Sequence, residues 1–349
     1  MSEPWIRVHS QDAFDVIIPK QNGSYSQALQ RMVAFVKAGA VLPFPRAQEE
    51  ELESEHETRR EECGLGAFAV VAVGGCSEGR AMPEVSCWNP ALGAARSLAP
   101  LKRSRRGHAS VVHNGVLIVA GGCGDFKIPM RSVEAYDVFA NEWTAMPSLR
   151  IPRSSPALVS LNDALYIIGG KSFVRHLCSV ERLDSGALAW TAVAPLPAAL
   201  EGHSALVANN CIFVFGQDIG TNTCVWCYDP AVNTWTARPH PRSYRLDFAL
   251  AVHSENAYIV AHQPCAQTVL LEYHLLTGTY GALEHLPQPD CNAPGCGRES
   301  RDKMVVCCAP VAGNIDLFML KNRKWTHVRR GPSTMQGMTA TTLFLPIAR

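Results

Sequence analysis

The strongest constraint on this chain is one pattern that recurs six times at a nearly constant spacing. The clearest copy has an apolar segment ending in a glycine pair (residues 116–122), a segment ending in an aromatic (132–137), and a Trp seven residues after that aromatic. Successive copies are offset by 48, 47, 45, 45 and 45 residues. The paired markers are Trp88 and Ala95, Tyr136 and Trp143, Leu183 and Trp190, Tyr228 and Trp235, Tyr273 and Tyr280, and Phe318 and Trp325. A fixed period of this length indicates an array of repeated structural units.

Each unit has the features of a small antiparallel sheet. A glycine at the end of a buried strand lets the chain turn sharply where a Cβ would not fit. A Trp supplies a large apolar plate between neighbouring sheets. The glycine positions are Gly74-Gly75, Gly121-Gly122, Gly169-Gly170, Gly216-Gln217, Ala261-His262 and Val306-Cys307. Four strands in about 45–50 residues predict the blade of a β-propeller, so we expect an all-β, six-bladed propeller.

The glycine pair, the aromatic and the Trp resemble the marks of the Kelch repeat, and the resemblance covers about residues 67–345. Expected inner strands are residues 107–112, 156–159, 202–205, 248–252 and 291–297. The first glycine-pair strand has no inner strand before it, whereas residues 337–344 match the inner-strand pattern. We therefore expect the C-terminal strand to complete the first blade and to close the ring, leaving no open sheet edge.

Residues 1–66 do not follow the repeat and are predicted to be a separate N-terminal segment, with the propeller spanning 67–349. A short strand is expected at 12–18. Leu29, Met32, Val33 and Val36 form one apolar stripe, which predicts a helix over residues 26–38. The acidic residues 48–57 read as a solvated linker. With 11 acidic and 7 basic residues the segment carries a net charge of −4, against +5 for the remainder, which places a boundary near residues 63–66.

Composition narrows the classes of function. The net charge of +1 gives no general argument for nucleic-acid binding, and no run of about 18 apolar residues suggests a membrane span. The N-terminus lacks the basic-then-apolar pattern of a signal peptide. Thirteen cysteines without the spacing of a disulfide framework favour free thiols in a reducing compartment. We expect a cytoplasmic protein.

No motif in the sequence indicates catalysis, a cofactor or a metal. His108 and His203 occupy the same repeat position, and we favour buried structural histidines over metal ligands because no metal-binding spacing accompanies them. Cys224 and Cys227 form a CxxC motif within an expected strand, where residues i and i+3 point to opposite faces. A zinc site is an unfavoured alternative for the last cysteine cluster, Cys291, Cys296, Cys307 and Cys308. The chain also lacks GxSxG, P-loop and dinucleotide-binding motifs.

One constellation points to binding. In a four-stranded blade, the loop between strands two and three and the loop between blades emerge on one face, where thirteen basic residues gather. They are Arg80, Lys102, Arg103, Arg105, Arg106, Lys127, Arg131, Arg150, Arg153, Lys171, Arg175, Arg242 and Arg245. A ring of loops focuses their field, and Arg pairs bidentately with carboxylates or phosphates. The predicted binding residues are Arg80, Arg105, Arg131, Arg153, Arg175, Arg242 and Arg245. Ordinary solvated charge is the alternative.

The resemblance to Kelch-like adaptors implies a protein-binding face that captures an acidic or phosphorylated segment. In that family the face recruits substrates to cullin-RING ubiquitin ligases, and an arginine often stands at the position of Arg105. Arg153 and Arg245 lie in the corresponding loops, so all three are expected to be exposed and to converge. The 66 residues before the repeats are too few for a BTB and a BACK domain. Alternatives are an actin-associated or other scaffold, or a Kelch-fold enzyme resembling the copper oxidases, whose ligand set cannot be placed here.

Overall fold

The computed structural model describes residues 5–9, 15–19, 68–89, 94–138, 140–173, 175–220, 222–240, 244–253, 255–262, 268–283, 296–300, 303–308, 313–321, 324–334 and 339–344, with side chains described only within 70–282. These residues form strands and turns, with no helix among them and therefore none able to cross a membrane. The predicted helix at 26–38 and the acidic linker lie outside the described residues. In the N-terminal segment, β1 (Trp5–His9) pairs with β2 (Asp15–Pro19), which overlaps the strand expected at 12–18.

The chain forms an all-β propeller of four-stranded antiparallel sheets, which we call blades. Blade 1 consists of β30 (Thr339–Phe344), β3 (Phe68–Val73), β6 (Val85–Asn89) and β7 (Ala94–Leu98). Blade 2 consists of β8 (Ala109–His113), β9 (Val116–Ala120), β10 (Val133–Asp137) and β11 (Glu142–Met146). Blade 3 consists of β12 (Ala157–Leu161), β13 (Ala164–Ile168), β16 (Val180–Asp184) and β17 (Thr191–Val193).

The remaining sheets repeat the same strand order in sequence. Blade 4 consists of β18 (Leu200–Ala208), β19 (Cys211–Asp218), β20 (Thr223–Asp229) and β21 (Thr234–Ala237). Blade 5 consists of β22 (Arg245–His253), β23 (Asn256–His262), β24 (Thr268–His274) and β25 (Tyr280–Leu283). Blade 6 consists of β26 (Cys296–Ser300), β27 (Lys303–Cys308), β28 (Gly313–Lys321) and β29 (Lys324–Thr334). Its inner strand therefore begins five residues later than the expected range 291–297.

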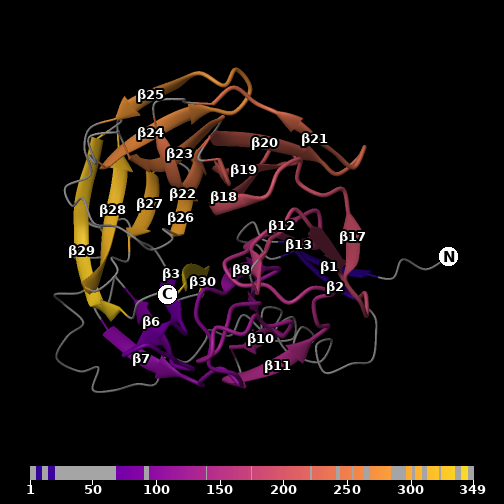
Figure 1. Cartoon of the computed structure of the whole chain (residues 1–349). Helices are drawn as coiled ribbons and strands as arrows, with labels where there is room; N and C mark the ends of the chain where they lie inside the picture. Colours follow the sequence, from indigo (N-terminus) through magenta and orange to yellow (C-terminus); the bar gives the residue numbers. More distant parts are fainter. Residues whose placement is uncertain are drawn as a thin grey trace.

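The sheets form a closed ring (Figure 1). Their first strands are neighbours in the cyclic order β30, β8, β12, β18, β22, β26 and back to β30. The ring closes because β30 pairs antiparallel with β3, with Phe344 opposite Phe68 and Thr339 opposite Val73. The prediction that the C-terminal strand completes the first blade is confirmed. The strand β30 consequently lies beside β3, at the start of the propeller (Figure 1).

The spacing of seven between the two markers has a simple structural meaning. Tyr136 is the direct cross-strand partner of Trp143, and Tyr228 is the partner of Trp235. Their ring centroids lie 5.1 and 5.0 Å apart with tilted planes, so each pair packs across the outer hairpin of its blade. The last copy differs, because register shifts in β28–β29 place Phe318 opposite His327 instead of Trp325.

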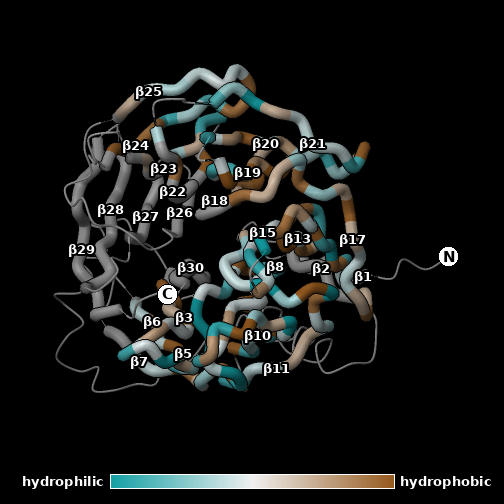
Figure 2. Tube along the Cα trace, viewed as in Figure 1, coloured by the Kyte–Doolittle hydropathy of each residue, from teal (hydrophilic) through white to brown (hydrophobic). Residues whose placement is uncertain are grey.

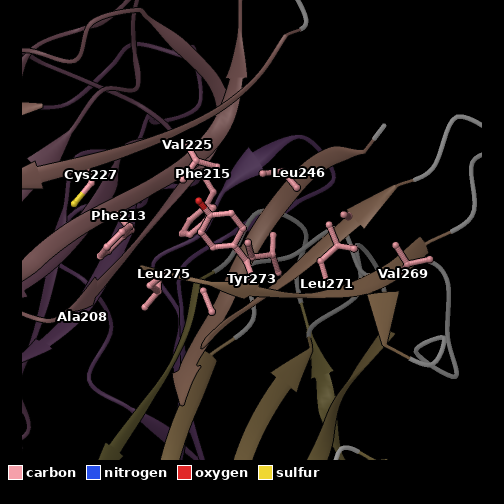
Figure 3. Packing of buried hydrophobic residues seen from close by; sticks show 13 residues of the cluster. Ala208, Phe213, Phe215, Val225, Cys227, Leu246, Val269, Leu271, Tyr273 and Leu275 are labelled. Carbon is pink, nitrogen blue, oxygen red and sulfur yellow. The ribbon is translucent and has the colours of Figure 1, made fainter. Parts of the chain in front are cut away.

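The core lies between adjacent blades, where the faces of neighbouring sheets pack. The second strands are the most apolar, as the brown stretches at β13 and β19 show (Figure 2), and β9 and β13 are buried at every position. Between blades 4 and 5, the rings of Phe215 and Tyr273 meet edge to face with centroids 5.5 Å apart (Figure 3). Large rings fill the wedge between blades and bury apolar area, which is the main stabilising term.

Candidate interaction face

The connections between the second and third strands of blades 1–3 form small hairpins and turns on one face of the ring. Blade 1 has β4 (Cys76–Ser77) paired with β5 (Arg80–Ala81), and blade 3 has β14 (Lys171–Ser172) paired with β15 (Arg175–His176). In blades 1 and 2 these connections touch, because the Ala81 backbone N–H donates to Asp125 Oδ1 at 2.6 Å. The connections of blades 1 and 2 are therefore direct neighbours on this face.

Three of the predicted arginines lie exposed on this face, namely Arg80, Arg131 and Arg175. Lys127 and Lys171 are exposed in the same connections. The ion pairs recorded among the described side chains involve other residues, so these five cations remain available to a partner within that part of the structure. Arg242 lies outside the described residues, and Arg245 is described only as the first residue of β22.

The prediction that Arg105 and Arg153 are exposed is wrong, because both side chains are completely buried. Arg153 Nη1 donates to the carbonyl oxygens of Gly169 and Ser179 at 2.8 and 3.0 Å. Its Nη2 donates to Ser179 Oγ at 3.1 Å and to Glu181 Oε1 at 2.5 Å. Burial lowers the pKa of this guanidinium, and the Glu181 carboxylate acts in the opposite direction. With its donors engaged, Arg153 cannot contact a partner on the surface.

Arg105 repeats this arrangement one blade earlier. Its Nη1 donates to the carbonyl oxygens of Gly121 and Ser132 at 2.9 and 3.1 Å, and its Nη2 donates to Ser132 Oγ at 3.0 Å and to the Glu134 carboxylate. Burial is again the largest cause lowering the arginine pKa. The two sites have the same structural role, since each arginine side chain forms hydrogen bonds with the blade that follows it in sequence.

The backbone of the same arginine holds the preceding blade. The Arg105 carbonyl accepts from the Gly75 backbone N–H at 3.0 Å, and its own N–H donates to the Met82 carbonyl at 3.2 Å. One residue therefore binds blade 1 through its main chain and blade 2 through its side chain. The partner, Glu134, also accepts from the Lys102 backbone N–H at 2.9 Å, so both of its oxygens are used.

This interblade linker explains the glycine pairs. A Cβ on Gly121 would lie 2.6 Å from the carbonyl oxygen of Arg153, and a Cβ on Gly74 would lie 2.7 Å from that of Arg105. Both glycines also have positive φ, of 67° and 57°. A side chain at either position would push the arginine-bearing linker away from the strand end. Glycine is thus required at these positions because the backbone of the buried arginines passes close to them.

The two matched histidines have structural positions. His108 is buried, and desolvation together with the nearby Arg105 charge lowers its pKa to about 3. His203 Nε2 donates to the carbonyl oxygen of Ile168 at 2.9 Å, and burial lowers the pKa of this imidazole as well. Each ring packs where a Cβ on the preceding blade's first glycine would lie, at Gly74 and Gly169. Neutral imidazoles at these positions fill space beside the glycine pairs.

The described thiols do not form a metal site. Cys224 and Cys227 lie in β20 as expected, with Cys227 buried and Cys224 partly exposed. Within residues 70–282 the seven cysteines with described side chains are free, and no group of three potential metal ligands is found. The side chains of Cys291, Cys296, Cys307 and Cys308 lie outside the described residues.

Two features of the face were missed from the sequence. The carboxylates that hold the buried arginines occur as a repeated Ser-Val-Glu, at Ser132–Glu134 and Ser179–Glu181, and this repetition was a usable signal. The second feature is a set of exposed apolar side chains between the cations, which are single loop residues without periodicity. They are Phe126, Ile128, Phe173 and Ile219.

The molecule is a closed ring of four-stranded blades in which buried arginines lie against the glycine pairs and Tyr–Trp pairs pack across the outer hairpins. The KLHDC2/KLHL20/DRC7 Kelch-repeats domain matches residues 67–261, which is more than half of the chain. The chain belongs to this Kelch-repeat family. Blades 2–4, three of the four strands of blade 1 and part of blade 5 fall within the match, including both buried arginine sites.

Individual relatives agree with the family. Kelch-like protein 35 of Mus musculus is 30% identical over 208 residues, covering 56% of this chain and 34% of the relative. Kelch-like protein 25 of Xenopus tropicalis is 28% identical over 57% of this chain and 35% of its own length. Alpha-scruin of Limulus polyphemus is 24% identical over 70% of this chain and 29% of its own length. The chain thus spans about a third of the length of these curated relatives.

A solved structure supports the fold alone. The protein titled "Structure of YjhT" superposes with a TM-score of 0.52 at 15% identity, covering 64% of this chain and 83% of that one. The face built from the strand-two-to-three connections is the candidate surface for binding a partner.

Proposed function

We propose that this chain is a protein-binding Kelch propeller whose exposed cations bind an acidic or phosphorylated segment of a partner protein. The observation that carries the proposal is the exposure of Arg80, Arg131 and Arg175 in neighbouring connections on one face. Guanidinium groups favour carboxylates and phosphates because they can donate two parallel hydrogen bonds. Arg105 and Arg153 contribute indirectly, by fixing the blades from which these loops project.

The test is a triple variant, Arg80→Ala, Arg131→Ala and Arg175→Ala, compared with wild type by affinity purification and quantitative mass spectrometry. Arg182→Ala is the matched control, because Arg182 is an arginine on strand β16 paired with Asp184 and not part of these loops. We expect the triple variant to lose partners that the control retains, with both variants melting like wild type. If the triple variant retains every partner, the cations are solvated charge and the binding surface lies elsewhere.

We further propose a substrate-adaptor role, as the resemblance to Kelch-like adaptors suggests, in a reducing compartment such as the cytoplasm. The free thiols among the described cysteines support that location. Recovery of a cullin with the wild-type protein supports assembly into a ubiquitin ligase. Recovery of actin without a cullin favours a cytoskeletal scaffold instead.

A further inference from the structure

We propose that the partner segment carries apolar side chains among its acidic ones, and that the chain binds them with four exposed apolar residues, the apolar loop tips. These are Phe126, Ile128, Phe173 and Ile219. The inference rests on the proposed function and specifies the chemistry of the partner. It concerns residues that neither the glycine, aromatic and Trp markers nor the buried arginine sites involve.

All four loop tips lie in equivalent connections. Phe126 and Ile128 lie between β9 and β10, Phe173 lies between β13 and β16, and Ile219 lies between β19 and β20. Connections between the second and third strands of successive blades emerge on the same face, because every blade has the same strand order. The tips of blades 2, 3 and 4 therefore belong to the face that carries Arg80, Arg131 and Arg175.

More than half of each of the four side-chain-bearing residues is exposed to solvent. Phe126 is 88% exposed, Phe173 and Ile219 are each 65% exposed, and Ile128 is 56% exposed. A single exposed apolar residue needs no explanation, but a cluster of them around one face is typical of an interaction site. Covering such side chains removes apolar surface from water, so even partial coverage by a partner is favourable.

The loops hold these side chains outward in ordered conformations. Phe173 lies at the tip of the β14–β15 hairpin with a φ of 51°, and Lys127 has a φ of 56°. Non-glycine residues in the left-handed region are uncommon and carry a conformational cost, which is often kept at functional positions. The Lys127 N–H donates to the Gly124 carbonyl at 3.0 Å, closing the turn around Phe126. In blade 4, Asp218 Oδ1 accepts from the Asn222 backbone N–H at 2.8 Å and closes the turn that presents Ile219.

In blades 2 and 3, cations stand beside the apolar tips in the same loops. Lys127 stands directly between Phe126 and Ile128, while Lys171 and Arg175 flank Phe173. The acids in these connections are Glu78, Glu84, Asp125 and Asp218, of which Asp125 accepts a hydrogen bond from the Ala81 backbone and Asp218 accepts from Asn222. In blades 2 and 3 the surface therefore offers apolar contacts next to positive charge. A peptide segment that mixes acidic with aliphatic or aromatic residues is complementary to both.

The alternation also favours a peptide over a lipid surface. Membrane-surface binding draws on a contiguous apolar area inserted below the headgroups. Here the apolar tips are divided among three loops that also carry charged residues, which suits a peptide whose side chains vary along its length. Anionic vesicles are therefore included in the test as the competing class of partner.

The experiment selects peptides from a displayed library of random 12-residue sequences on three versions of the full chain. The tip variant is Phe126→Ser, Phe173→Ser and Ile219→Ser. The control variant is Leu188→Ser, Val232→Ser and Leu276→Ser, whose side chains are 88%, 62% and 51% exposed in connections between the third and fourth strands, on the opposite face. The two variants thus remove comparable exposed apolar groups from opposite faces.

We expect wild type and the control variant to enrich peptides with both acidic and apolar residues. The tip variant should still enrich acidic residues but lose the apolar enrichment. It should bind the peptides selected on wild type at least about tenfold more weakly. If wild type enriches acidic peptides without an apolar component, the inference is overturned and the proposed function stands. If wild type enriches no acidic peptides, the proposed function fails with it.

Vesicles containing phosphatidylserine provide the remaining arm. A membrane surface would be favoured, and the inference overturned, by three results together. Wild type would co-sediment with these vesicles but not with phosphatidylcholine vesicles, and the tip variant would lose this binding. The peptide selection on wild type would show no apolar enrichment. Melting curves of the three proteins must coincide. Single variants, each carrying one of the three tip substitutions, serve as replacements if the triple change lowers stability.

Discussion

Arg153 and Glu181 form an ion pair with an N–O separation of 2.5 Å, and neither side chain reaches solvent. The arginine's remaining donors are satisfied by Ile151, Gly169 and Ser179, so the pair is part of a larger hydrogen-bond network. A buried pair of this kind is costly to break because the remaining partner becomes an uncompensated buried charge. The pair therefore acts as a structural joint between blades 2 and 3.

The first prediction concerns this joint. Arg153→Ala and Glu181→Ala should each lower the free energy of unfolding by about 3–5 kcal/mol, whereas the double change should cost clearly less than the sum. Urea denaturation of the four proteins gives the coupling energy. The exposed Arg182–Asp184 pair is the control, and its disruption should cost less than about 1 kcal/mol. Equal effects at both pairs would show that burial does not control the energetics.

The second prediction concerns the two hydrogen bonds to the Ala99 backbone. Trp143 Nε1 donates to the Ala99 carbonyl at 2.8 Å, while the Ala99 N–H donates to Asn141 Oδ1, also at 2.8 Å. Trp143→Ala should cost about 3–5 kcal/mol, because it removes a buried ring and this hydrogen bond together. Trp235 makes the same bond to Ala194 but is only half-buried, so Trp235→Ala should cost less. Chemical denaturation measures both, and a larger loss at Trp235 would contradict the burial argument.

The third prediction is a pH dependence of stability. His108 has a pKa of about 3 in the folded chain, against an ordinary value of 6.5. Because the unfolded chain binds this proton more readily, the contribution is fully present above about pH 6.5 and is lost as the pH falls toward 3. The slope is up to about 1.4 kcal/mol per pH unit.

His108→Gln should remove this part of the slope. Unfolding free energies of wild type and the variant, measured at pH 7, 6, 5 and 4, should converge as the pH falls. His113, whose pKa is lowered to about 4, contributes to both curves and cancels in the difference. Parallel curves would mean that His108 binds its proton equally well in the folded and the unfolded chain.

Much of the fold followed from the sequence because the propeller is built from short-range patterns. The spacing of Tyr136 and Trp143 encodes a cross-strand pair, and the inner-strand pattern near residue 340 located the closing strand. The site followed less well, because loop position does not determine which way a long side chain points. Arg105 stands in a loop but reaches inward to Glu134, and only the repeated Ser-Val-Glu sequence carried that information. The apolar loop tips have no pattern that separates them from ordinary loop residues.

The fourth prediction concerns closure. Deleting residues 339–349 removes the strand partner of β3 and opens the ring, so the truncated chain should lose its cooperative thermal transition and associate through the free edge. Circular dichroism and light scattering during heating measure both effects. Deleting residues 1–20 is the control, because β1 and β2 pair only with each other in the described structure. A truncated C-terminus that melts like the control would show that β30 is dispensable.

The pairing of Phe68 with Phe344 also sets an order of events during synthesis. On the ribosome, β3 emerges long before its neighbour β30, so the first blade to be translated is the last to be completed. Until then its inner edge offers unpaired backbone groups to any other nascent chain, the situation in which chaperones are needed. A premature stop anywhere before residue 339 would therefore leave this edge permanently open, however well the intervening blades had formed.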